Sequence, residues 1–189
     1  MKRNQKARPM NQAGQKSEAM IALRLPVVAA GSEFLVQGYL MRRNILTYKA
    51  PPNNEGYDLI YIHPDPRHKS IKMQKAQIRV QVKSRYATDC RRILLVREST
   101  LDAFDYLIVA FLNIGNFFRG NDGTKGDKLP EFYTLPASLV RKHFHTSPAG
   151  WPKVALAGMR DELAVYKDEQ GFEQIAKALG IPRPKRTVQ

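Results

Sequence analysis

The spacing of apolar and polar positions predicts one helix followed by three strands in the first half of the chain. Apolar residues recur at helical spacing as far as Met41, with Ser32 as the expected N-cap and Glu33 in the first turn. The helix should end within residues 42–44. Two runs rich in β-branched and aromatic residues predict short strands, and strict alternation around Gln81 predicts a longer one. The expected strands cover residues 45–49, 56–63 and 77–84.

In the second half of the chain, the same kind of pattern predicts two more strands and two more helices. The apolar run Ile93–Val96 fits a helix and a strand equally well, so residues 86–104 stay unassigned. Pro136 is expected to begin a helix that includes Phe144, and Gly180 to end the last helix. The strands are expected over 106–114 and 132–135, and the last helix over 169–179. This order predicts an α/β single domain, with a central mixed sheet flanked by helices.

The ends of the chain differ from its middle. Residues 1–18 are polar and basic and show no apolar period, which predicts a disordered arm. Residues 19–180 form the expected domain, and residues 181–189 form a basic tail. The lone Cys90 excludes an intramolecular disulfide, and we find no signal peptide and no apolar run long enough to cross a bilayer. These features favour the cytoplasm, with nucleoid association in a bacterium or archaeon.

Positive charge is the strongest signal in the composition of this chain. The 189 residues carry a formal net charge of +14 at pH 7, with a pI near 10.0. Between Arg67 and Arg97, every charged residue is basic except Asp89. Such an excess favours a polyanion as partner, and nucleic acid before a membrane, because no lipid-anchoring motif is evident. A solvated basic face without a partner is the ordinary alternative.

Candidate chemistry is concentrated on two neighbouring predicted strands. Asp58 lies on one of them, while alternation places Gln81 and Lys83 together on one face of the next. Hydrolysis of a phosphodiester with a divalent cation needs oxygen ligands and positive charge near the phosphoryl oxygens. Asp58 and Gln81 offer the oxygens, Lys83 offers the charge, and the carboxylate of Glu33 can approach from the helix. Taken singly, each residue also fits an ordinary structural or solvated role.

The order of these residues resembles the PD-(D/E)XK nuclease superfamily, in its Holliday-junction-resolvase-like branch. The resemblance extends from G-S-E-F-L-V-Q-G-Y-L through G-Y-D-L-I and I-R-V-Q-V-K-S-R to F-D-Y-L-I-V-A-F. It implies a restriction-endonuclease-like fold, with Asp58 as a ligand of Mg²⁺ or Mn²⁺ and Lys83 as the catalytic lysine. Glu33 matches the helix carboxylate of some branches. Gln81 stands where the superfamily usually has Asp or Glu, and a neutral ligand attracts Mg²⁺ less than a carboxylate.

These observations lead to two expected functions. The first is a metal-dependent endonuclease that hydrolyses DNA. The second is a weak or inactive nuclease-fold protein that binds DNA or RNA, and a lesser possibility is a basic component of a ribonucleoprotein or phage-defence assembly. Resolvase-like proteins are often dimers, so a homodimer is also considered, although the sequence identifies no dimer surface. The side chains expected to contact phosphates are Arg42, Arg43, Lys69, Arg79, Arg85, Arg91 and Arg92.

Overall fold

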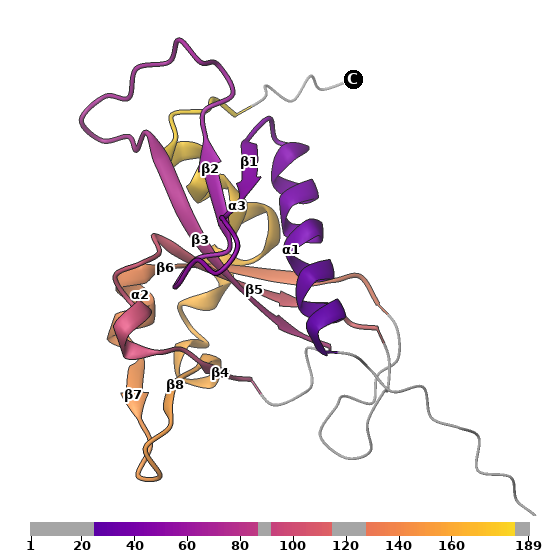
Figure 1. Ribbon diagram of the computed structural model, residues 1–189, viewed down its shortest axis with the longest axis vertical. Helices are drawn as coiled ribbons and strands as arrows, with labels where there is room; N and C mark the ends of the chain where they lie inside the picture. Colours follow the sequence, from indigo (N-terminus) through magenta and orange to yellow (C-terminus); the bar gives the residue numbers. More distant parts are fainter. Residues whose placement is uncertain (1–24, 87–91, 115–127, 184–189) are drawn as a thin grey trace, which may run out of the picture.

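A five-stranded mixed sheet is the centre of the molecule (Figure 1). The computed structural model describes residues 25–86, 92–114 and 128–183. The strand order is β1-β2-β3-β5-β6, and only the β3–β5 pair is parallel. The expected α/β class with a mixed sheet is therefore confirmed. The strands are β1 (Leu46–Lys49), β2 (Leu59–Ile62), β3 (Gln77–Arg85), β5 (Tyr106–Phe111) and β6 (Glu131–Pro136).

Two helices, α1 (Leu25–Met41) and α3 (Asp168–Ala178), cover one face of this sheet. Their apolar side chains share one core with those of β2, β3 and β5. Within it, the ring centroid of Tyr39 lies 4.9 Å from that of Phe132 and 6.1 Å from that of Phe172. Burying an aromatic or aliphatic side chain of this size contributes roughly 1.5–3 kcal/mol. This core holds the two helices on the sheet.

A second sheet and several short helices cover the opposite face. The second sheet has the order β4-β8-β7, and its Leu94 and Val154 pack with Leu107 and Val109 of the large sheet. Its strands are β4 (Ile93–Leu95), β7 (Phe144–Thr146) and β8 (Pro152–Ala155). The helices on this side are α2 (Ala137–Lys142) and the 3₁₀ turns η1 (Glu98–Thr100), η2 (Leu156–Met159) and η3 (Leu163–Tyr166).

The first helix covers Leu25–Met41 and so includes eight residues, 25–32, that the sequence prediction left outside it. Ser32 is buried inside α1, and its hydroxyl donates to the carbonyl of Val28 at 2.7 Å, so it is not an N-cap. Pro26 lies in the first turn, where a missing N–H costs nothing, so the apolar residues after it continue the helix. The expected end is confirmed, because α1 stops at Met41 and Asn44 has a left-handed φ of 60°.

The second helix is shorter than predicted, because Phe144 belongs to strand β7 and not to α2. Its side chain packs against the core on the second-sheet side, and its backbone pairs with Val154. Strand β8 was not predicted, and the unassigned segment 86–104 contains strand β4 and turn η1. The five expected strands and α3 are confirmed within a few residues, and Gly180 follows α3 with a φ of 75°.

The arm over residues 1–18 lies outside the described residues, as do Cys90, Arg91 and residues 184–189 of the basic tail. Among the described helices, none has both the length and the apolar composition needed to cross a membrane.

Candidate active site

The turn before β2 fixes the position of Asp58. Gly56 has a φ of 94°, and a Cβ there would lie 2.3 Å from that of Ala103, so the close approach to the η1 region requires glycine. The amide of Asn54 donates to the carbonyl of Tyr57 at 2.7 Å and closes the turn. Asp58 therefore enters β2 from a defined turn, directly before the first paired residue of the strand.

Hydrogen bonds across the sheet hold the Asp58 carboxylate against β3. The backbone N–H of Asp58 donates to the carbonyl of Val80 at 2.8 Å. Its Oδ2 accepts from the backbone N–H of Val82 at 2.7 Å. Val80 faces the core beneath α1 and α3, so alternation along β3 turns Gln81 and Lys83 to the opposite face. The carboxylate, the amide and the amine expected from the sequence thus lie on one side of two paired strands.

These three side chains line a single pocket of about 580 Å³. Its walls come from the turn before β2, from β3, from the segment around β4 and from the β7–β8 hairpin. The lining also contains the cationic side chain of Arg97 and the apolar side chains of Leu95 and Trp151. It further includes Glu55 and Asn54, so the pocket combines two carboxylates, two cationic side chains, two amides and an exposed indole.

Burial shifts the pKa values of Asp58 and Lys83 in opposite directions, in each case toward the neutral form. Burial raises the pKa of Asp58 and the nearby Glu33 adds to the rise, whereas the Val82 N–H and Lys83 oppose it. Burial lowers the pKa of Lys83, with Arg85 and Arg97 adding to the effect and Asp58 opposing it. Each residue therefore stabilises the charged form of the other, but neither compensates for the loss of water.

Gln81 contributes an oxygen atom without a partner. The side chain is 9% exposed, and its Oε1 is buried with no hydrogen-bond partner among the described residues. A buried amide oxygen normally has a partner, so its free lone pairs suit a cation or a water molecule. No group of three His, Cys, Asp or Glu side chains in the described ranges is placed to hold a metal ion. A cation here would need the amide oxygen beside the Asp58 carboxylate.

Glu33 lies near Asp58 but does not line the pocket. It lies within α1, and its Oε2 forms an ion pair with Nζ of Lys49 on β1 at 2.8 Å. Its side chain is 21% exposed. The charge of Glu33 therefore acts on Asp58 through space, while Lys49 partly neutralises it.

The side chains expected to contact phosphates do not gather at this pocket. None of the six that are described lines it, and Arg91 lies outside the described residues. Arg85 donates to the carbonyls of Ser84 and Ile93, and Arg79 lies 3.5 Å from the carboxylate of Asp105. Their phosphate contacts stay a prediction. Of the others, Arg42 and Arg43 line a second pocket beside α3, Arg92 lies over the Phe111 ring, and Lys69 is solvent-accessible in the β2–β3 loop.

Several pocket residues were not singled out from the sequence, among them Arg97 and Trp151. Arg97 belongs to the basic stretch but follows the unassigned segment, so nothing placed it near Asp58. Trp151 precedes a strand that showed no alternating pattern, and its signal was only that it is the sole tryptophan. Both lie beside strands of the second sheet, whose packing on β5 and β6 is a long-range feature of the fold.

Comparison with known proteins adds a distant similarity to a solved structure. The chain matches no protein-family model and no curated protein sequence. It is similar to the structure of a bacterial homing endonuclease, I-Ssp6803I, with 13% sequence identity and a TM-score of 0.45. The similarity covers 82% of this chain and 96% of that chain. A likeness at this TM-score carries no functional argument, so the function must be inferred from the geometry of the site.

Proposed function

We propose that the protein is a nuclease that hydrolyses phosphodiester bonds in nucleic acid, DNA first, with Mg²⁺ or Mn²⁺. One observation carries the proposal: Asp58, Gln81 and Lys83 line one pocket, and the Gln81 Oε1 there has no described partner. The site would follow the PD-(D/E)XK arrangement, with Gln81 in place of an acidic ligand. The net charge of +14 supports a polyanionic substrate.

The donor set fits a hard divalent cation. Asp58 supplies a carboxylate, Gln81 supplies a neutral oxygen, and the Glu33 carboxylate adds negative charge nearby. A bound Mg²⁺ would supply Lewis-acid activation of water and stabilise charge on the phosphoryl oxygens. The positive charge of such an ion would also offset the unfavourable burial of Asp58.

The cationic side chains of the pocket would bind and orient the phosphodiester. Lys83 is held beside Asp58, from where its ammonium can donate to a phosphoryl oxygen as negative charge builds up. Its lowered pKa makes it a better proton donor and acceptor near neutral pH than a solvated lysine. Arg97 is exposed at the pocket and would hold the phosphate that enters.

Cleavage of supercoiled plasmid DNA tests this proposal. The parent should nick plasmid with Mg²⁺ or Mn²⁺ and not with a chelator. Asp58→Asn and Lys83→Met should each lower the rate by about 10²-fold or more, because each removes a charge from the reacting centre. The matched controls Asp161→Asn and Lys177→Met alter exposed residues outside the pocket and should cleave like the parent. Equal rates for all five proteins would refute the proposal.

A second candidate function is nucleic-acid binding without cleavage. Its specific motivation is the neutral Gln81 together with the absence of a three-residue acidic or histidine cluster in the described part of the chain. In that case the protein would bind nucleic acid equally well with a chelator or with Mg²⁺. Asp58→Asn would leave the affinity unchanged or raise it slightly, because it removes a negative charge from the binding surface. Plasmid would remain intact throughout.

A further inference from the structure

The second sheet presents a mixed apolar and basic surface beside the pocket. Its register aligns Leu95, Lys153 and His145 across β4, β8 and β7. The neighbouring positions Leu94 and Val154 face the core, so alternation turns the aligned row outward. Leu95 is 52% exposed and also lines the pocket. In Figure 1 the β7–β8 hairpin projects away from the large sheet.

Hydrogen bonds across the turn of this hairpin fix the backbone of Trp151. The N–H of Ser147 donates to the carbonyl of Trp151 at 3.0 Å, and the N–H of Trp151 donates to the Ser147 hydroxyl at 3.1 Å. Gly150 closes the loop with a φ of 78°, as expected of a three-residue hairpin turn with a bulge. The indole is nevertheless 62% exposed. A rigid backbone therefore presents a large aromatic surface to solvent at the mouth of the pocket.

Charge decides which ligand suits this surface. An isolated exposed tryptophan is ordinary, but Trp151 shares its pocket with the cations Lys83 and Arg97 and lies two residues from Lys153. The same pocket also holds the carboxylates of Glu55 and Asp58, so the excess of positive charge comes from Lys153 and from the net charge of the chain. A flat apolar group carried on an anionic chain matches this combination, and a nucleic-acid strand has both parts. An aromatic ring stacks on any base whose face is free. In an uninterrupted duplex, the neighbouring bases cover those faces.

We propose that Trp151 stacks on an unpaired nucleobase next to the phosphate held in the Asp58–Lys83 pocket, which selects substrates with single-stranded segments. The inference rests on the proposed function for the identity of the pocket. It extends that function by naming the substrate class: strands with unpaired bases, such as single strands, flaps and branch points. Lys153 would contact the phosphate on the other side of the stacked base.

Fluorescence of the sole tryptophan tests the stacking without any cleavage. Protein in a chelator is titrated with oligothymidylate of about 10 nucleotides, an abasic strand of equal length and a blunt duplex. We expect the indole emission to be quenched by oligothymidylate and not by the abasic strand, with weaker quenching by the duplex. Asp161→Asn, an exposed position outside the pocket, should be quenched like the parent. Because the chelator prevents metal-dependent cleavage, the quenching result does not depend on whether the protein is a nuclease.

Affinity measured by anisotropy of a labelled strand separates stacking from charge. Trp151→Ala should weaken binding of oligothymidylate by roughly tenfold and leave binding of the abasic strand unchanged, while Trp151→Phe should recover most of the loss. Equal quenching by the abasic strand, or equal affinity of all three proteins for oligothymidylate, would overturn the proposal. A concentration-dependent emission change without nucleic acid, unaffected by oligothymidylate, would also overturn it and assign the surface to a second copy of the chain.

Discussion

Three side chains at the strand pair β2–β3 define the chemistry of this molecule. Asp58 and Lys83 are ionisable and half-buried, with pKa values that burial shifts toward their neutral forms, and Gln81 has a buried oxygen without a partner among the described residues. Such an arrangement costs stability, because burial disfavours both charges and the free lone pairs lack a donor. Proteins keep costs of this kind mainly at functional sites. These three residues therefore form a site in which a bound ligand would supply the missing interactions.

Replacing Gln81 with Glu tests whether this position faces a bound cation. A second carboxylate beside Asp58 should destabilise the metal-free protein, because two buried like charges repel, by roughly 1–3 kcal/mol. With Mn²⁺ or Mg²⁺ the variant should bind the ion roughly tenfold or more tightly than the parent. Thermal unfolding with and without metal, together with calorimetric titration, measures both effects.

Gln170→Glu provides the matched control for this substitution. Gln170 is exposed on α3, which covers the other face of the sheet. The control should show neither the loss of stability nor the gain in metal affinity. A Gln81→Glu protein that binds metal no better than the parent would exclude Gln81 as a ligand and favour the binding-only function.

The sequence predicted the members of this cluster but not all of their surroundings. Alternation along β3 was enough to put Gln81 and Lys83 on one face, because the side-chain period of a strand is two. The distance of Glu33 from the pocket depends on how α1 packs across the sheet and on its ion pair with Lys49. Arg97 and Trp151 arrive from the second sheet. Local patterns carry no information about such long-range packing.

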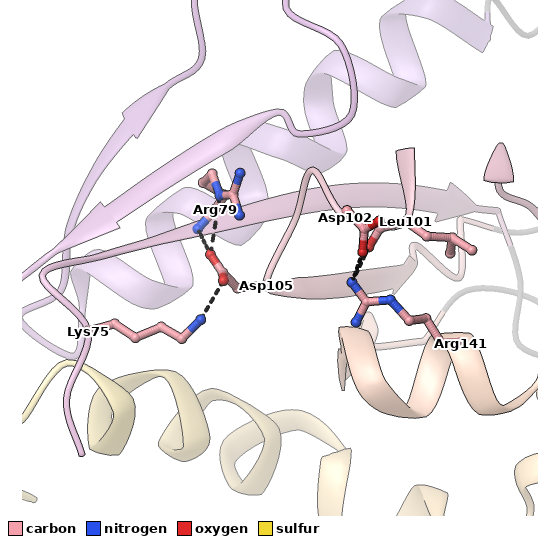
Figure 2. A network of polar contacts seen from close by, with 6 residues as sticks. All are labelled: Lys75, Arg79, Leu101, Asp102, Asp105 and Arg141. Atoms are coloured by element: carbon pink, nitrogen blue, oxygen red, sulfur yellow. Dashed lines mark hydrogen bonds and ion pairs between the residues drawn. The ribbon is translucent and has the colours of Figure 1, made fainter. Parts of the chain in front are cut away.

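At the scale of elements, Asp105 joins the beginnings of β3 and β5 to the end of β6. Its carboxylate accepts from the backbone N–H of Arg79 at 2.7 Å and from Nζ of Lys75 at 2.5 Å (Figure 2). Its backbone N–H donates to the carbonyl of Arg79, and its carbonyl accepts from Ala137 at the start of α2. The strand that carries Gln81 and Lys83 is thus fixed near its first residues.

The pKa of Asp105 predicts a pH-dependent contribution to stability. Burial alone would raise this pKa, but hydrogen bonds from Arg79 and Lys75 outweigh it and hold the pKa below its ordinary value of 3.8. The unfolded state therefore binds more protons between the two pKa values, so the stabilisation is present above the ordinary value and is lost as pH falls through the folded one. Asp105→Asn should lower the free energy of unfolding by about 2 kcal/mol at neutral pH.

The nearby Asp102 offers the control for Asp105. Its side chain is 91% exposed and pairs with Arg141 at the surface, as Figure 2 shows. Asp102→Asn should change the free energy of unfolding by less than about 1 kcal/mol. Chemical denaturation at several pH values should show the cost of Asp105→Asn shrinking below about pH 4. A cost independent of pH would show that the carboxylate charge plays no part.

Element boundaries show where sequence patterns fail. The strands β3 and β5 and helix α3 follow their patterns because each has a strong, uninterrupted period. Ser32 was misread because a serine before an acid fits an N-cap equally well as a serine donating to the carbonyl four residues earlier. Phe144 continues a helical spacing, yet pairing with β8 and burial against the core place it in a strand. Tertiary packing overrides local preference in both cases.

At the scale of the whole molecule, excess positive charge is not confined to the candidate active site. Arg42 and Arg43 lie at the end of α1 beside α3, on the face of the sheet opposite the second sheet. Arg97 and Lys153 lie on the side of the second sheet. Long-range attraction from a net charge of +14 therefore brings a polyanion to the protein without selecting the pocket. Binding of the polyanion at the pocket must therefore depend on short-range contacts.

The salt dependence of nucleic-acid affinity distinguishes these two effects. If about six phosphates are contacted, the logarithm of affinity should fall with the logarithm of salt concentration at a slope of about −5. Arg97→Gln should make this slope shallower by about one, because it removes a phosphate contact at the pocket. Lys177→Gln removes the same charge from the exposed face of α3 and should leave the slope unchanged. Equal slopes for Arg97→Gln and the parent would show that the nucleic acid does not run past the pocket, whatever its affinity for the rest of the surface.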